Sequence, residues 1–223
     1  MPRQLCPINF YRRNVFMKSF FSMFKESAGE MKNISCLTVT GMMMALSIVL
    51  RNLSVYITND LRITFSFLGI MVIAMLYGPT VSIIANVGVD IIGYFLDGFK
   101  ARDYNFGLLA VKIIIAAVYG ACLYKKVTGR SIIAAGAISR AIAVIFGNLI
   151  LNSAVLYYCY TNPNFPFMSA SEWNAFGIWF APRVIKNAVM LPIEIAMISF
   201  LLPAVRMAYQ RVFSGKIRPK FEK

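Results

Sequence analysis

The chain contains six long stretches in which apolar residues dominate and charged residues are rare. An α-helix needs about 20 apolar residues to cross the roughly 30 Å hydrocarbon core of a bilayer, because it rises only 1.5 Å per residue. Hydrophobic residues make up 59% of the 223 residues, which exceeds the share in ordinary soluble domains. We therefore predict an all-α membrane protein with six transmembrane helices, over residues 36–57, 63–77, 80–96, 106–124, 132–158 and 176–207.

The positions of the basic residues predict how these helices are oriented. Loops rich in Lys and Arg stay on the cytoplasmic side of a membrane. Six basic residues precede residue 35 and six more follow residue 205, and the loop after the fourth predicted helix carries Lys125, Lys126 and Arg130 without an acidic residue. An even number of helices returns the chain to its starting side. We therefore predict that the N and C termini are both cytoplasmic.

These patterns divide the chain into three parts. We expect a cytoplasmic extension over residues 1–35, a six-helix membrane domain over 36–207 and a basic cytoplasmic tail over 208–223. The extension repeats Phe16, Phe20 and Phe24 at a helical spacing, which is typical of a helix lying in the membrane interface. A disordered tail, or an upstream extension of a protein that starts at a later Met, explains the same residues equally well.

The overall charge and the missing residue types narrow the possible functions. A net charge of +14 would indicate nucleic acid in a soluble chain, but here the basic residues gather at the predicted cytoplasmic ends, so we expect a lipid bilayer and no nucleic acid as partner. The chain has no His, which removes the usual general base and zinc ligand. Its four Cys are scattered without CxxC spacing, so we infer neither a disulfide framework nor a metal site.

Two basic residues, Arg183 and Lys186, lie near the start of the last apolar stretch and share one face of a helix. A cation beside hydrocarbon is costly, so such residues face a protein cavity and await an anion. A carboxylate from outside would reach them, and Phe176, Trp179 and Phe180 nearby can support a flat ring. The alternative is that both cations anchor the helix at the membrane interface.

Four other charged residues interrupt the predicted helices, namely Asp90, Lys112, Arg140 and Glu194. None should face lipid, and we expect each acid to be neutralised by a basic residue on a neighbouring helix. Asn148 and Asn152 share one face of the fifth predicted helix, where an amide can read a heterocycle or can bond to another helix.

Two further segments have more than one interpretation. Gly41 and Ala45 form a small-xxx-small step on the first helix, which suits either internal packing or a subunit interface. The polar residues 52–62 can form an outer lid over a pocket or a plain connector.

Several segments between residues 37 and 205 resemble a known family. They are LRITFSFLG (61–69), LYGPTVSIIANVGVDIIGYFL (76–96), YGACLYKK (119–126), LILNSAVLYY (149–158) and PRVIKNAVMLPIE (182–194). Together they are similar to the substrate-binding S components of energy-coupling-factor (ECF) vitamin transporters, particularly the folate type. The resemblance implies a six-helix protein that captures a vitamin from outside and docks on a transmembrane coupling subunit driven by two ATPases. It also implies a docking motif at Gly41 and Ala45, and a pocket lined or supported by Arg62, Asn152, Arg183, Lys186 and Asn187.

The leading hypothesis is therefore a binding subunit for folate or a similar pterin-glutamate, without a cofactor of its own. The chain lacks a Walker-type phosphate loop, so the partner ATPases would use the ATP. An S component for another vitamin is the nearest alternative. A membrane enzyme that uses Asp90 or Glu194 as acid or base, and a channel, are the alternatives from other classes.

Overall fold

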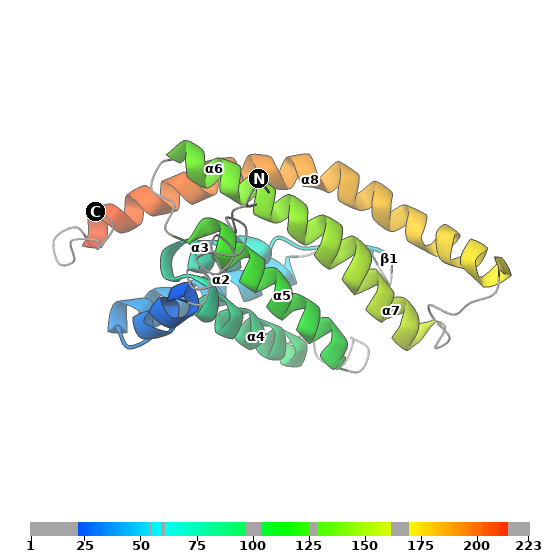
Figure 1. The fold of residues 1–223 in the computed structure, drawn as a ribbon, viewed down its shortest axis with the longest axis horizontal. Coiled ribbons are helices and arrows are strands. Elements are labelled where there is room, and N and C mark those ends of the chain that lie inside the picture. The colour runs from blue at the N-terminus through cyan, green and yellow to red at the C-terminus, as the bar shows by residue number, and fades with distance from the viewer. Residues whose placement is uncertain are drawn as a thin grey trace, which may run out of the picture.

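The computed structural model describes residues 22–53, 55–58, 61–96, 104–124, 129–161 and 170–213. A helix over residues 22–30 precedes the labelled elements of Figure 1. These are α2 (Ile34–Asn52), β1 (Val55–Thr58), β2 (Leu61–Ile63), α3 (Phe67–Tyr77), α4 (Pro79–Leu96), α5 (Phe106–Leu123), α6 (Gly129–Ile142), η1 (Ala143–Asn152), α7 (Ser153–Tyr160) and α8 (Ala170–Phe213). The fold is helical apart from the small antiparallel pair β1–β2.

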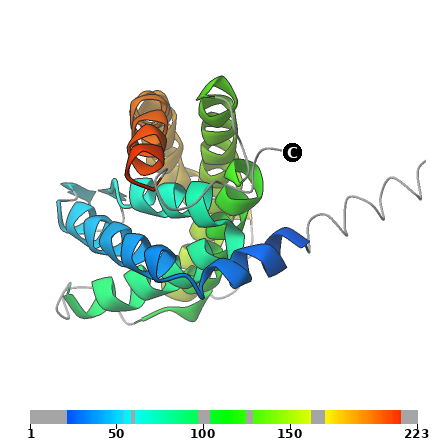
Figure 2. The same cartoon turned by 90° about the vertical axis from the view of Figure 1, so that its left-hand side faces the viewer.

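The helices form a bundle in two groups (Figures 1 and 2). α6, η1 and α7 follow one another as a single rod that lies beside α8, while α2 and α4 pack together on the other side. α5 bridges the groups, since it contacts α4 and also α6 and η1. The short helix α3 lies among them and touches α2, α4, α5 and α8.

α3 forms the centre of the core. All of its residues except Leu76 are buried, and its side chains are apolar all round, which is typical of an internal helix. Its 11 residues extend only about 16 Å, so α3 alone is too short to cross a bilayer. Among the described residues, five helical stretches are long and apolar enough to span a membrane.

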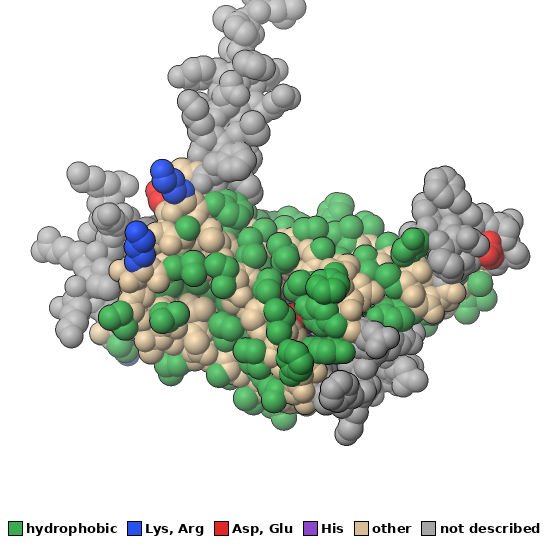
Figure 3. Space-filling model, turned by 90° about the horizontal axis from the view of Figure 1, so that it is seen from below, with side chains coloured by type: hydrophobic (Ala, Val, Ile, Leu, Met, Phe, Trp, Pro, Cys, Tyr) green, Lys and Arg blue, Asp and Glu red, His purple; other side chains and the backbone are tan. Residues whose placement is uncertain are grey.

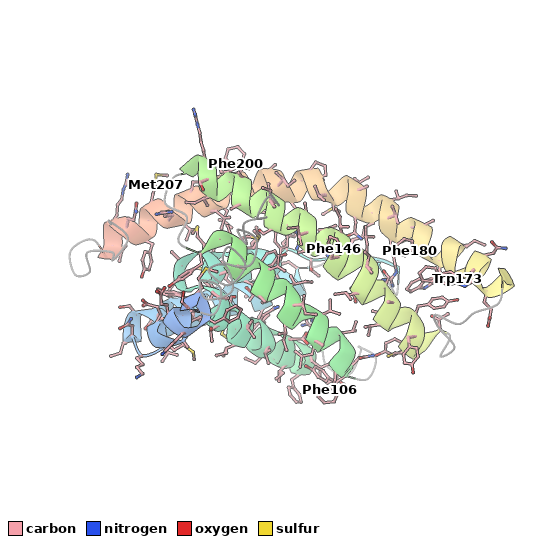
Figure 4. The ribbon with its side chains drawn as sticks, viewed as in Figure 1. Phe106, Phe146, Trp173, Phe180, Phe200 and Met207 are labelled. Carbon is pink, nitrogen blue, oxygen red and sulfur yellow. The ribbon has the colours of Figure 1, made fainter. Side chains whose placement is uncertain are left out.

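The outer surface of the bundle is apolar. In Figure 3 hydrophobic side chains are spread over the face in view, and few charged side chains lie among them. Phe106, Phe146, Phe200 and Met207, which Figure 4 labels, are all more than half exposed. Exposed apolar surface of this extent marks contact with lipid, which confirms the prediction of a multi-pass membrane protein.

The segment between the first two predicted helices folds differently from the prediction. The first helix was expected to reach residue 57 and the second to begin at 63, but α2 ends at Asn52 and α3 begins at Phe67. The residues between form the β1–β2 hairpin, in which Val55 pairs with Ile63. β-Branched and aromatic residues such as those of Val55–Thr58 favour extended structure, and apolar content alone does not distinguish them from the end of a helix.

α8 is longer than the predicted helix over 176–207. Its 44 residues extend about 66 Å, roughly twice the thickness of the hydrocarbon core. Pro182, Pro192 and Pro203 lie inside it, where each removes a backbone donor and promotes bending. The ribbon accordingly curves along the whole length of the bundle (Figure 1).

The helix over residues 22–30 packs against the turn between α3 and α4. Ser27 is fully buried, and its hydroxyl donates to the Tyr77 carbonyl at 2.6 Å and accepts from the Thr80 and Val81 amides at 3.0 and 3.3 Å. Ser27 therefore caps the first turn of α4 from outside that helix. Gly78 has φ +87°, and a side chain there would also crowd Ser27. Phe16 and Phe20 of the predicted interfacial helix lie outside the described residues.

Candidate functional site

A cavity of about 140 Å³ opens between six helical elements: α2, α3, α4, α5, α6 and η1. Pockets that enclose a whole drug-sized ligand usually measure about 300–1,000 Å³, so this cavity fits one end of such a ligand. Part of its wall is apolar, including Phe67 and Ile70 of the core helix α3. Its charged and amide side chains are Arg51, Asn86, Asp90, Lys112, Arg140 and Asn148.

On one side of this cavity, Asp90 forms ion pairs and a hydrogen bond with residues of its neighbouring segments. Its carboxylate pairs with the Arg51 guanidinium of α2 at 3.2 Å and with the Lys112 ammonium of α5, and it accepts a hydrogen bond from the Tyr104 hydroxyl at 3.3 Å. Burial and the neighbouring Asp90 carboxylate raise the pKa of Tyr104, so this hydroxyl keeps its proton and remains a donor. Among the described residues, two cations thus contact this one carboxylate.

Arg51 reaches Asp90 because α4 carries a glycine next to it. A Cβ atom at Gly93 would lie 2.7 Å from Nη1 and 2.8 Å from Cζ of Arg51, which is closer than such atoms approach in proteins. Gly93 thus leaves the space in which the guanidinium crosses the surface of α4.

Arg140, which lines the cavity, belongs to a buried ion pair. Arg140 of α6 donates from Nε and Nη2 to the two carboxylate oxygens of Glu194 on α8, at 2.8 and 2.6 Å, and from Nη1 to the Tyr119 hydroxyl at 2.6 Å. The guanidinium also lies 3.7 Å from the centre of the Phe67 ring. The prediction that Asp90 and Glu194 are neutralised by basic residues of neighbouring helices is therefore confirmed, with Lys112 and Arg140 among those residues.

The residues predicted on α8 lie along the same face as Glu194. Arg183 is 7% exposed, and 11 residues, or about three helical turns and 16 Å, separate it from Glu194. Asn187 donates from its side-chain amide to the Arg183 carbonyl at 2.8 Å, and Lys186 is partly buried within electrostatic range of Glu194 and Arg140. These residues form a polar track on α8, and its last member, Glu194, bonds to Arg140 in the cavity lining.

Aromatic rings surround the outer end of this track. The Arg183 guanidinium lies 4.0 Å from the centre of the Trp179 ring, as in a cation–π contact. Phe176 and Phe180 stack with their ring centres 5.4 Å apart, and Tyr157 of α7 meets Phe176 and Trp179 edge to face. Figure 4 shows Phe180 and Trp173 on the part of α8 that faces α7. These rings form an apolar cluster beside a buried cation.

The structure separates the two asparagines that were predicted to share a face. Asn148 of η1 lines the cavity, whereas Asn152, at the end of η1, does not.

The other predicted site residues also lie outside the cavity lining. Arg62 lies in β2 opposite Tyr56, and the β1–β2 hairpin leads directly into Thr64 and Ser66 at the cavity wall. Arg183, Lys186 and Asn187 also lie outside the lining, along the track on α8. Arg51 was not predicted as a site residue, because in the sequence it ends an apolar helix next to polar Asn52 and so resembles an interfacial residue.

Gly41 and Ala45 are exposed on α2. A Cβ atom at Gly41 would meet no group of the described residues within 4 Å. Within the described parts of the chain, no cluster of three or more His, Cys, Asp or Glu side chains could hold a metal ion.

Residues 35–202 match the sequence model of a protein family described as "ECF transporter, substrate-specific component". The chain belongs to this family. As an S component it is a membrane subunit of a transporter that works with the other members of an ECF complex, and it is not an enzyme. The family assignment overturns the membrane-enzyme alternative.

Relatives of this S component cover most of its length. A folate transporter FolT of Leuconostoc mesenteroides subsp. mesenteroides is 30% identical over 163 residues, which is 72% of this chain and 80% of the relative. A folate transporter FolT of Clostridium novyi (strain NT) is 24% identical over 74% of this chain and 86% of the relative. The crystal structure of FolT bound with folic acid superposes with a TM-score of 0.62 at 24% identity, over 77% of this chain and 95% of that one. The S component therefore shares the FolT fold.

Proposed function

We propose that this S component binds folate from the outer side of the membrane and delivers it to an ECF complex. Its relatives from Leuconostoc mesenteroides and Clostridium novyi are folate transporters, which supports folate as the ligand. The observation that carries the proposal is the polar track on α8, which runs from a buried Arg183, in cation–π contact with Trp179, to Glu194, the partner of the cavity-lining Arg140.

The dimensions of the track suit an elongated ligand with two different ends. The heterocycle would enter the cavity, whose volume of about 140 Å³ suits one end of a ligand. The glutamate carboxylates would reach Arg183 and Lys186, the first through a bidentate fork and the second as a compact charge. Asn187 supports the backbone at Arg183, while Arg62 and Asn152 would contact or support the ligand from the hairpin and from η1.

The proposal includes the arrangement in the membrane. Residues 36–207 would form the six-helix substrate-binding domain, with α3 as its short internal member, between a cytoplasmic extension at 1–35 and a basic tail at 208–223. Both termini would be cytoplasmic. Gly41 and Ala45, exposed on α2, would dock on the transmembrane coupling subunit, and two partner ATPases would use ATP while this chain needs no cofactor of its own.

The experiment compares folate affinity in purified wild type and in an Arg183→Ala, Lys186→Ala double variant. Charge-assisted hydrogen bonds contribute about 1.5–3 kcal/mol each, so losing both should weaken binding by about 100-fold or more. An Arg206→Ala, Arg211→Ala variant removes two basic residues elsewhere on α8 and should bind as wild type does. Equal folate affinity in all three proteins would reject the assigned site. Tighter binding of another vitamin in a ligand panel would redirect the proposal to that vitamin.

A further inference from the structure

We propose that the π-helical geometry of η1 turns Asn148 into the cavity and makes its amide the group that reads the edge of the ligand's heterocycle. This inference rests on the proposed function, because it assigns the cavity to the heterocycle. It singles out Asn148 from the two asparagines that the sequence offers for this role.

The helical geometry of η1 decides the direction of the Asn148 side chain. A regular α-helix turns about 100° per residue, so eight residues would place Asn148 about 80° away from Arg140, with Gly147 on the cavity side instead. Residues 143–152 are π-helical, with backbone bonds to the fifth residue back, and therefore turn less per residue. Arg140 and Asn148 both line the cavity as a result.

Close packing holds η1 in this position. A Cβ atom at Gly147 would lie 2.6 Å from Cδ1 and Cγ1 of Ile115 on α5, so η1 approaches α5 more closely there than any other residue would allow. Ile115 itself lines the cavity. The Ser153 hydroxyl donates to the Asn148 carbonyl, five residues back, at 3.3 Å. The wide helical turn therefore lies against the cavity wall.

The side chain of Asn148 is available for a ligand. Among the described residues, the structure records no hydrogen bond, ion pair or other polar contact for its carboxamide. Asn86, the other amide of the lining, already donates to the Lys112 carbonyl at 2.8 Å. An amide offers one acceptor and a pair of donors side by side, which matches a ring edge that presents an adjacent N–H and carbonyl. The 2-amino-4-oxopyrimidine ring of a pterin has such an edge.

The test uses two fragments of folate as probes, pterin-6-carboxylate and 4-aminobenzoylglutamate. Asn148→Leu keeps the size of the side chain and removes its polar groups. We expect it to weaken binding of folate and of pterin-6-carboxylate about tenfold or more, and to leave 4-aminobenzoylglutamate binding unchanged. Asn148→Ser serves as a second, smaller variant in case the first does not fold, with the same expected pattern. Asn52→Ala changes an exposed asparagine outside the cavity lining and is the matched control.

The outcomes separate this inference from the proposed function. Folded Asn148 variants that bind pterin-6-carboxylate as tightly as wild type would overturn the inference. In that case, folate binding by the wild-type protein would still support the proposed function. An equal loss for both fragments would also overturn it, because that pattern indicates a general effect on the fold. Failure of wild type to bind folate at all would overturn the proposed function itself.

Discussion

Arg140 on α6 and Glu194 on α8 meet through two parallel hydrogen bonds, of 2.8 and 2.6 Å, in the interior of the bundle. Each side chain is 8% exposed. The pair joins the rod that carries Asn148 to the helix that carries Arg183, so it fixes the distance between the two halves of the proposed site. A buried charge left alone is costly, which makes the pair a stringent test of the fold.

Removing one member of this pair should destabilise the protein strongly. Glu194→Ala leaves the Arg140 charge buried without its carboxylate, and we expect a loss of about 3–5 kcal/mol in unfolding free energy. Thermal unfolding in detergent measures the change. An Arg140→Met, Glu194→Met double variant removes both charges and should lose much less stability. The account is contradicted if the double variant is as unstable as Glu194→Ala.

Gly93→Ala should disturb the cluster around Asp90. The new methyl group would collide with the Arg51 guanidinium, whose nearest atom lies 2.7 Å from the Cβ position. We expect a stability loss of about 1–3 kcal/mol and weaker folate binding, measured by thermal unfolding and titration. Gly88→Ala is the matched control on the same helix, because its Cβ would meet only the flexible end of Met44, which can move aside. Equal effects of the two substitutions would show that Arg51 is not the affected group.

Ser27→Ala should weaken the junction between α3 and α4. The substitution leaves two amides of the first turn of α4 and the Tyr77 carbonyl without their partner. The expected loss is about 1–2 kcal/mol in unfolding free energy, as for other helix caps. Thr38→Ala removes an exposed hydroxyl that bonds only to its own helix and should have little effect. If Ser27→Ala is as stable as wild type, the helix over residues 22–30 does not brace this turn.

The sequence predicted the helices and the neutralisation of the buried acids for clear physical reasons. Long apolar stretches must span the membrane as helices, and Asp90 and Glu194 within them must find cations. Three other features have no such signature. The strand Val55–Thr58 is as apolar as a helix end, the π-helical turn of η1 depends on packing at Gly147, and the contact of Arg51 with Asp90 depends on which helices become neighbours.

The candidate site was predictable in part for the same reason. Arg183 stands out in the sequence because a cation in an apolar helix needs an explanation, and the structure places it in a buried position on Trp179. Asn148 and Asn152 look equivalent in the sequence, and only the path of η1 past α5 distinguishes them. Tertiary packing therefore decides which polar residues share the cavity.

The central claim is that this S component binds folate by itself, before it meets its partners. Calorimetric titration of the purified wild-type protein with folate tests it most directly. The account predicts saturable one-to-one binding with a Kd below about 1 µM, a binding free energy of about −8 kcal/mol or stronger. A folded protein that shows no saturable folate binding would contradict it.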